Sequence, residues 1–348
     1  MQNQRLAARD LDLVLAETGS LWDEVRGEQL FITGGTGFFG CWLVESFCYI
    51  NQQLGLDARI AILTRSPGAF RAKAPHLAAD PAVQLIEGDV RNFVFPEGEF
   101  RYVIHAATEA SAKQAAEAPL EMLSTIVDGT RRTLEFAKEH GTRRFLLTSS
   151  GAVYGKQPPE VTHLPESYRG APDPLDTGSV YGEGKRAAEL MCALYQKTAG
   201  FECAMARCWA FCGPHLPLDA HFAIGNFIGN ALRDEPIAIQ GDGTPRRSYL
   251  YGADLAIWLW TMLFRAPALV PINVGSAEDV SFLALAQEVV RVLRPSTPIK
   301  VAGKPATGAP PSHYVPSVER AKELLGLRQT VCLEETIRRT AEWYGHPV

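Results

Sequence analysis

The stretch Gln29-Leu-Phe-Ile-Thr33, followed at once by Gly34-Gly-Thr-Gly-Phe-Phe-Gly40, decides the fold of this 348-residue chain. Its first five residues form an apolar run typical of a strand buried on both faces, and we expect a helix from about residue 38 to 51. The glycines follow a G-x-x-G-x-x-G spacing: Gly34 permits a tight turn, Gly37 lets the backbone approach a pyrophosphate, and Gly40 lets the helix pack close to the sheet. Because the N-terminus of such a helix presents free N–H groups and a positive dipole end, the stretch predicts a dinucleotide site.

Apolar strands and helical stretches alternate along the rest of the first 210 residues. Further strands are predicted at 59–64, 82–86, 102–105, 144–148 and 203–207, with helices at 126–140 and 181–198. This alternation predicts βαβ units and an α/β fold with a parallel sheet covered on both faces. After about residue 213 prolines and glycines become frequent, which predicts a smaller C-terminal lobe with long loops.

Composition and charge narrow the functional class. The formal net charge of −5 argues against a nucleic-acid partner, since such proteins normally carry a basic face. The apolar run 255–264 is too short to span a bilayer and predicts a buried helix, and the N-terminus has no apolar signal region, so we expect a cytoplasmic protein without a membrane partner. The seven cysteines form no C-x-x-C pair, which predicts mostly buried thiols and no metal site.

Residues after the second and third strands bear on the choice of cofactor. An acid usually ends the second strand when the cofactor is NAD, but Thr64 and Arg65 stand there, and Arg65 could pair with the 2′-phosphate of NADP. This favours NADP over NAD, although Arg65 could equally be a solvated surface residue. After the third strand, Asp89 could accept a hydrogen bond from the adenine amino group or serve as a turn residue.

Tyr181 and Lys185 are spaced to lie on one face of a helix. A phenol with a pKa near 10 is about three units too weak an acid for proton transfer at neutral pH. An ammonium one turn away stabilises the phenolate and lowers that pKa, and a shift of three units corresponds to roughly 4 kcal/mol of stabilisation. Ser150 follows the fifth strand, whose carboxyl end faces the cofactor crevice of such a sheet. Together the three residues predict a site for carbonyl reduction or alcohol oxidation.

At this point the chain resembles the extended short-chain dehydrogenase/reductase family, in its nucleotide-sugar epimerase, dehydratase and reductase branch. The resemblance covers about residues 28–330 and rests on TGGTGFFG (33–40), GDV (88–90), HAA (105–107), TSSGAVYG (148–155), YGEGK (181–185), RCWAFCGP (207–214), GDGTPRRSYLYGADL (241–255) and NVGS (273–276). It implies a Rossmann-type doubly wound parallel sheet with a smaller mixed α/β C-terminal substrate lobe. The expected domains are an N-terminal helical extension (1–27), a dinucleotide-binding Rossmann domain (28–212, with later returns at about 246–275) and a mainly substrate-binding lobe (213–348).

The resemblance implies catalysis by Ser150, Tyr181 and Lys185. The expected cofactor-binding residues are Gly34, Thr36, Gly37, Phe38, Phe39, Gly40, Thr64, Arg65, Asp89, Val90, Ala106, Ala107 and Lys185.

The resemblance also implies a nucleotide-diphosphate sugar as substrate. Arg247 matches the arginine that contacts the substrate phosphates, and His221 and Asn226 lie in the segment that lines the nucleotide pocket; Thr108 and Ser150 are also expected to bind substrate. Arg247 could alternatively be a surface arginine beside Arg246. A homodimer is implied as well, through a bundle of the helices around 115–140 and 181–198.

The chain departs from the family at several positions. In the 4,6-dehydratases an Asp-Glu pair precedes V-Y-G, whereas Ser150-Gly-Ala152 stands here, which argues against water elimination. Ala210, Cys212 and Ile126 replace residues usual in relatives and indicate an atypical substrate pocket.

The leading functional hypothesis is a 4-keto-sugar reductase, because NADP is mostly reduced in cells. The alternative is a 4-epimerase with retained NAD(P). A non-catalytic dinucleotide-binding regulator ranks low, because the catalytic set is intact.

Overall fold

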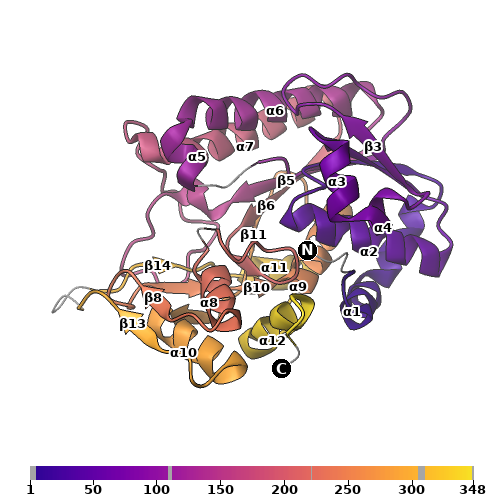
Figure 1. The fold of residues 1–348 in the computed structure, drawn as a ribbon. Helices are drawn as coiled ribbons and strands as arrows, with labels where there is room; N and C mark the ends of the chain where they lie inside the picture. The colour runs from indigo at the N-terminus through magenta and orange to yellow at the C-terminus, as the bar shows by residue number, and fades with distance from the viewer. Residues whose placement is uncertain (1–4, 109–111, 221, 305–309, 347–348) are drawn as a thin grey trace. The chain divides into compact units, whose positions relative to one another are not determined.

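The computed structural model describes residues 5–108, 112–220, 222–304 and 310–346. The chain divides into two compact units (Figure 1). Unit 1 comprises Met1–Gly155, Gly170–Cys208 and Ala256–Ile272, and unit 2 comprises Lys156–Arg169, Trp209–Leu255 and Asn273–Val348. The assignment of a cofactor role to one part and a substrate role to the other stays a prediction.

A seven-stranded sheet forms the centre of unit 1, in the order β11-β6-β5-β4-β1-β2-β3. Its strands are β1 (Gln29–Thr33), β2 (Arg59–Thr64), β3 (Val83–Glu87), β4 (Tyr102–His105), β5 (Arg144–Ser150), β6 (Glu202–Cys208) and β11 (Pro271–Val274). The pairs among β1 to β6 are parallel, and the chain reverses its direction of travel across the sheet between β1 and β4. In such sheets ligands bind outside the carboxyl ends of the strands at this switch point. The expected α/β fold is confirmed.

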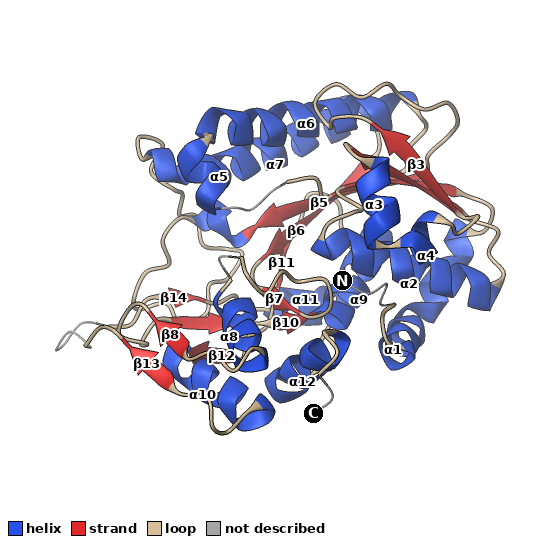
Figure 2. Ribbon diagram, viewed as in Figure 1, coloured by secondary structure: helices blue, strands red, loops and turns tan. Residues whose placement is uncertain are grey.

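One face of this sheet is covered by two long helices that lie side by side, α6 (Pro119–Glu139) and α7 (Val180–Ala199) (Figure 2). They bury an aromatic core in which the ring centroids of Phe31 and Phe136 lie 4.2 Å apart. Gly184 on α7 allows the close approach, since an added Cβ would lie 3.1 Å from the Ile126 side chain on α6. Helix α6 begins seven residues before the expected start at Ile126, because Pro119 at its first turn is preorganised for a helix.

The N-terminal extension packs onto the rest of unit 1. It forms α1 (Ala8–Thr18) and the 3₁₀ helix η1 (Gly19–Val25), and it contacts α2 (Phe38–Leu54). Trp22 is fully buried, with its ring centroid 4.8 Å from that of Trp260 in α9 (Gly252–Arg265). Trp260 in turn donates its Nε1–H to Ser46 Oγ at 3.0 Å. The expected buried helix at 255–264 is confirmed by α9. The remaining short helices of this unit are α3 (Pro67–Lys73), α4 (Pro75–Ala78), α5 (Ala112–Glu117), η2 (Gly151–Tyr154) and η3 (Thr177–Ser179).

Unit 2 mixes short strands with helices, as expected for the C-terminal lobe. Among the described residues, its three small sheets pair β10 with β7, β9 with both β12 and β14, and β13 with β8. The strands are β7 (Phe211–Cys212), β8 (Ile237–Ile239), β9 (Arg246–Ser248), β10 (Leu250–Tyr251), β12 (Asp279–Ser281), β13 (Ile299–Val301) and β14 (His313–Tyr314). The helices are α8 (Ala223–Leu232), α10 (Phe282–Leu293), α11 (Glu319–Leu325) and α12 (Leu333–Trp343).

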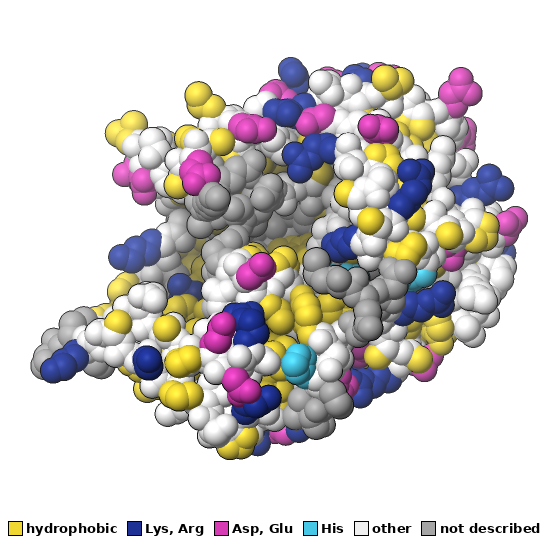
Figure 3. Space-filling model, viewed as in Figure 1, with side chains coloured by type: hydrophobic (Ala, Val, Ile, Leu, Met, Phe, Trp, Pro, Cys, Tyr) yellow, Lys and Arg dark blue, Asp and Glu magenta, His cyan; other side chains and the backbone are white. Residues whose placement is uncertain are grey.

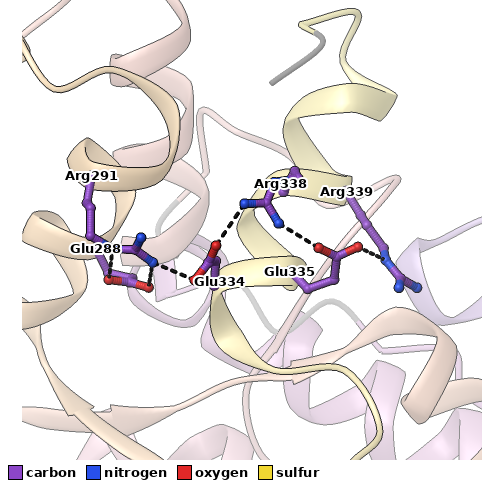
Figure 4. Close-up of polar contacts among 6 residues, drawn as sticks. All are labelled: Glu288, Arg291, Glu334, Glu335, Arg338 and Arg339. Atoms are coloured by element: carbon purple, nitrogen blue, oxygen red, sulfur yellow. Dashed lines mark hydrogen bonds and ion pairs between the residues drawn. The ribbon is translucent and has the colours of Figure 1, made fainter.

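A chain of ion pairs joins α10 to α12 on the surface of unit 2 (Figure 4). Glu334 accepts from Arg291 and from Arg338, at 2.7 Å in both cases, and Glu335 accepts from Arg338 and Arg339 at 2.8 Å. Because exposed pairs contribute only about 0.2–1 kcal/mol each, this network adds modestly to the packing of the two helices.

The surface and the cysteines complete the description. Side chains of both charges are interspersed over the face drawn in Figure 3. Across the described residues, no helix combines the length and apolar character needed to cross a membrane. Six of the seven cysteines are buried and Cys332 is exposed, so the expectation of mostly buried thiols is confirmed.

Candidate active site

The glycine-rich turn between β1 and α2 lies against the turn that follows β4. Gly34 has φ +74°, and a Cβ added there would lie 2.5 Å from the carbonyl carbon of Ala106. A Cβ added at Gly40 would lie 2.3 Å from the Gly34 oxygen, so both positions require glycine. Gly37 caps α2, and its own N–H donates to the Gly34 oxygen at 3.1 Å. The backbone therefore forms a bare, tightly folded cradle at the start of a helix.

A cavity of 440 Å³ opens beside this cradle, at the carboxyl ends of β1, β2, β3 and β4. Among the residues expected to bind the cofactor or the substrate, those that line it are Gly34, Thr36, Gly37, Thr64, Arg65, Asp89, Val90, Ala106, Ala107 and Thr108. Phe38, Phe39, Gly40 and Lys185 do not line it. Residues that sequence reasoning missed also line it, namely Leu63, Ser66, Ala69, Phe70, Lys73, Gly88 and Thr125.

Two cationic side chains, Arg65 and Lys73, lie at the β2 side of this cavity. Lys73 ends α3 and donates to the Thr36 oxygen in the glycine turn at 2.7 Å. Helix α3 starts at Ser66-Pro67, where Ser66 Oγ accepts from the Ala69 N–H. A Ser-Pro pair directly after a strand is a helix-start signal. This pair could have predicted the short helix whose last residue is Lys73.

Asp89 serves as a turn residue, and its contact with adenine stays a prediction. It lines the cavity, and its carboxylate also accepts from the Arg91 backbone N–H at 2.9 Å, which closes its own turn. The Arg91 guanidinium forms a two-pronged ion pair with it, at 2.8 and 2.9 Å, and this hydrogen bonding lowers the pKa of Asp89. Asp89 is therefore a fixed anionic acceptor at the wall of the cavity.

The three expected catalytic residues come from β5 and α7. Ser150 is the last residue of β5, is buried, and accepts from the Ala152 N–H at 3.1 Å through its Oγ. Lys185 is buried on α7, with its Nζ 5.9 Å from the ring centroid of Tyr181, one helical turn earlier. Burial lowers the pKa of Lys185 to about 8. With that pKa the ammonium stays mostly charged at pH 7, and a positive charge beside a phenol favours its phenolate form, which suits proton transfer near neutral pH.

Two fixed oxygens hold the Lys185 ammonium. Its Nζ donates to the Thr148 carbonyl oxygen at 2.7 Å and to Thr108 Oγ1 at 2.9 Å. Thr108, which was expected to bind substrate, donates its own hydroxyl hydrogen to the Ala107 oxygen at 2.7 Å. The structure thus connects Thr108 to Lys185, and the role of Thr108 toward substrate stays a prediction.

A half-buried ion pair lies one helical turn beyond Lys185. Glu189 accepts from Arg207 at 2.9 and 2.7 Å, and also from Ser149 Oγ at 2.6 Å. Arg207 additionally lies 4.7 Å above the ring of Tyr154. These contacts join α7 to β5 and β6 next to Ser150 and one turn from Lys185. Sequence reasoning missed the ion pair, because Arg207 lies on a separate strand and no local spacing connects it with Glu189.

In unit 2, Arg247 lies on β9 and is not a solvated surface residue. Its guanidinium lies 5.4 Å from the ring of Phe282 and 5.7 Å from that of Tyr314, and burial lowers its pKa. Asn226 lies on α8 and is partly buried. His221 lies outside the described residues. The expected roles of all three in substrate binding stay predictions.

Residues 30–275, most of the chain, match the family described as the NAD dependent epimerase/dehydratase family. The chain belongs to this family. The resemblance to extended short-chain dehydrogenases/reductases is thereby confirmed, and so is the expectation of an enzyme.

Other members of the family resemble the chain over nearly its whole length. UDP-glucuronic acid decarboxylase 1 of Arabidopsis thaliana is 32% identical over 311 residues, which are 89% of this chain and 68% of the relative. An epimerase from Methanothermobacter thermautotrophicus superimposes with a TM-score of 0.78 at 22% identity, covering 96% of this chain and 95% of that one. A dTDP-glucose 4,6-dehydratase from Streptomyces venezuelae, solved with NAD bound, gives 0.77 at 22% identity, covering 91% and 97%. The two solved structures establish a shared fold.

NAD, the cofactor named for this family, fits the cavity of unit 1. The bare backbone at Gly34 and Gly37 leaves room for a pyrophosphate at the start of α2, where N–H groups point outward. Thr64 and Arg65 lie where the second strand ends, and Asp89 offers a fixed acceptor at the wall. These residues would hold the adenosine half of the dinucleotide.

Proposed function

We propose that the chain catalyses NAD-dependent hydride transfer at C4 of a nucleotide-activated sugar, in a redox-neutral cycle that inverts C4. The observation that carries this proposal is the buried Lys185 ammonium, held by Thr108 and Thr148 one turn from Tyr181 and near the end of the strand that carries Ser150. When bound, NAD supplies an acceptor for the C4 hydrogen as hydride and a donor that returns it.

Each side chain has a separate task at the C4 oxygen. Tyr181, as phenolate, takes the proton of the C4 hydroxyl and gives it back when the ketone is reduced. Lys185 stabilises the phenolate, and with a pKa of about 8 it is still mostly charged at pH 7. Ser150 donates a hydrogen bond to the same oxygen and so orients it. Atoms balance, because the sugar loses one proton and one hydride and regains both.

The segment Thr148–Gly155 supports hydride transfer without elimination. It contains no aspartate or glutamate, so this loop offers no carboxylate to abstract a proton next to the ketone. A sugar with a carboxylate at C6 behaves differently, because its 4-ketone is a β-keto acid that can lose CO2 without a further catalytic group. UDP-glucuronic acid therefore belongs among the substrates to be tested.

A 4-keto-sugar reductase is the second candidate. Arg65 and Lys73 beside the cavity favour it, since they could pair with the 2′-phosphate of NADP, whose cellular pool is mostly reduced. The sequence analysis ranked the reductase first and the epimerase second. Because the chain belongs to an NAD-dependent epimerase/dehydratase family, we now rank the redox-neutral cycle first.

Cofactor stoichiometry separates the two candidates. Purified enzyme is incubated with NAD and UDP-, CDP- or dTDP-hexoses, or with UDP-glucuronic acid, and products are followed by NMR together with absorbance at the NADH band. We expect a C4-inverted product with no net change in that band. A second incubation contains NADPH and a 4-keto-sugar. If NADPH is consumed in proportion to the 4-keto-sugar, and the incubation with NAD gives no product inverted at C4, the chain is a reductase instead.

Tyr181→Phe tests the proton-transfer step. We expect turnover to fall by at least about a hundredfold, because a positioned acid–base group contributes that much, while NAD affinity changes little. Tyr195→Phe is the matched control, since it removes a half-buried phenol from the same helix away from the site. Normal turnover in Tyr181→Phe would contradict the mechanism.

The homodimer implied by the resemblance stays a proposal. Helix α7 exposes Leu190 and Leu194, at 61% and 54%, and α6 exposes Leu120 at 81%. Large exposed apolar side chains on two adjacent helices are typical of an association surface.

A further inference from the structure

A chain of buried polar groups crosses the carboxyl ends of β1, β4 and β5, and His105 is at its centre. His105 ends β4 and is 1% exposed. Its Nδ1 lies 2.8 Å from Thr33 Oγ1 at the end of β1, and its Nε2 lies 3.0 Å from Thr130 Oγ1 on α6. Neither the proposed chemistry nor the glycine cradle uses this histidine directly.

The hydrogen bonds around Thr33 fix the tautomer of His105. Thr33 Oγ1 already accepts from the backbone N–H groups of Ala106 at 3.2 Å and Ala107 at 3.1 Å. With both lone pairs used, the hydroxyl hydrogen points to His105 Nδ1, which must therefore be unprotonated. Burial and the nearby charge of Lys185 lower the pKa of His105 to about 3, so the ring is neutral and its Nε2–H donates to Thr130.

The hydrogen bonds to Thr33 also position two residues in the wall of the cofactor cavity. Ala106 and Ala107 line that cavity. The Ala107 N–H donates to the Thr33 hydroxyl, and the Ala106 N–H is shared between that hydroxyl and the Thr33 carbonyl oxygen at 3.1 Å. Ala106 is also the residue that an added Cβ at Gly34 would strike at 2.5 Å. The hydrogen bonds of Thr33 with His105, Ala106 and Ala107 thus fix the distance between the glycine turn and the turn after β4.

The chain continues from His105 to the catalytic lysine. The His105 carbonyl oxygen accepts from Thr148 Oγ1 at 3.2 Å, and the Thr148 carbonyl oxygen accepts from Lys185 Nζ at 2.7 Å. Lys185 also donates to Thr108, which directly follows Ala106 and Ala107 in the sequence. One set of hydrogen bonds therefore connects the cofactor cradle with the acid–base site.

We propose that His105 is a positioning residue: with Thr33 and Thr130 it holds Ala106 and Ala107 against the glycine turn, and so it sets the affinity for the dinucleotide. This inference goes beyond the proposed function, because it concerns dinucleotide binding and holds whichever sugar is the substrate.

Two valine variants on one helix test the proposal. Thr130→Val removes the hydroxyl that fixes His105 Nε2, whereas Thr133→Val removes an equally buried hydroxyl that only donates to the Gly129 oxygen of its own helix at 2.8 Å. NAD dissociation constants are measured by calorimetry and melting temperatures by circular dichroism. We expect Thr130→Val to weaken NAD binding about tenfold and Thr133→Val less than about twofold, although both lower the melting temperature.

Thr33 provides a second comparison that does not depend on the stability of Thr130→Val. Thr33→Val keeps the branched shape in β1 and loses the hydroxyl, and we expect it to weaken NAD binding by more than about tenfold. Thr33→Ser keeps the hydroxyl and is expected to restore affinity to within about threefold of the wild type. Equal NAD affinities for the two Thr33 variants, or equal losses for Thr130→Val and Thr133→Val, would overturn the proposal.

Discussion

Replacing Lys185 by methionine is expected to abolish activity and yet stabilise the fold at neutral pH. Lys185 is 2% exposed, and burial lowers the pKa of its ammonium from 10.5 to about 8. At 1.36 kcal/mol for each pH unit of difference, folding with this group charged costs about 3 kcal/mol at pH 7. Methionine has a similar length and no charge, so Lys185→Met removes that cost.

The variant also loses two hydrogen bonds. The Thr148 carbonyl oxygen and Thr108 Oγ1 lose their donor, at about 1 kcal/mol each. The net gain at pH 7 is therefore about 1 kcal/mol. Between pH 8 and 10.5 the unfolded wild type binds more protons than the folded protein, so its stability rises with pH. By pH 10.5 the cost of the charge is gone, and we expect Lys185→Met to be about 2 kcal/mol less stable than the wild type.

Urea unfolding at pH 7 and pH 10.5, followed by circular dichroism, measures this reversal. Lys197→Met is the matched control, because Lys197 is exposed on the same helix and its loss is expected to leave the pH dependence unchanged. Turnover by Lys185→Met should fall by on the order of a hundredfold or more. The reasoning is refuted if Lys185→Met and the wild type show the same pH dependence of stability between pH 8 and 10.5.

Three further predictions follow from single residues. Arg65→Ser is expected to weaken NADP binding about tenfold and to leave NAD binding within about twofold in calorimetry, and an equal loss for both would show that Arg65 does not face a 2′-phosphate. His105 has a folded pKa of about 3, below the ordinary 6.5, so the unfolded state binds more protons between these values and stability falls as pH drops below 6.5, by up to about 1.4 kcal/mol for each pH unit. Urea unfolding at pH 5 and 6.5 should show this loss in the wild type and a smaller one in His105→Phe. Leu190→Glu is expected to shift the protein from dimer to monomer in light scattering, while an unchanged mass would place any dimer interface elsewhere.

Local pattern was sufficient for much of the fold. The strands expected at 29–33, 59–64 and 102–105 have those bounds in the structure, because each is a short apolar run closed by a turn. The helix at 181–198 differs by one residue at each end. Element ends were less certain where the pattern was weaker, as at Pro119, which opens α6 ahead of the expected start.

Local spacing predicted the part of the candidate site whose residues lie close together in the sequence, whereas Asp89, Ala106 and Ala107 were expected from the family resemblance and line the same cavity. Gly34 and Gly37 are fixed by the turn they form, and the spacing of Tyr181 and Lys185 follows from one turn of a helix. Lys73 was missed, although it lines the same cavity, because it reaches the site from a separate helix.

The sequence by itself thus determined the glycine cradle, the alternation of strands and helices, and the pairing of a phenol with an ammonium, since all three depend on neighbours a few residues apart. Only the tertiary structure decided that Thr33 contacts His105 across 72 residues, and that Thr108 holds Lys185 across 77. Such contacts depend on the order of strands in the sheet, which places β1 beside β4 and β4 beside β5. Hydrophobic periodicity repeats within each strand and carries no record of which strands become neighbours.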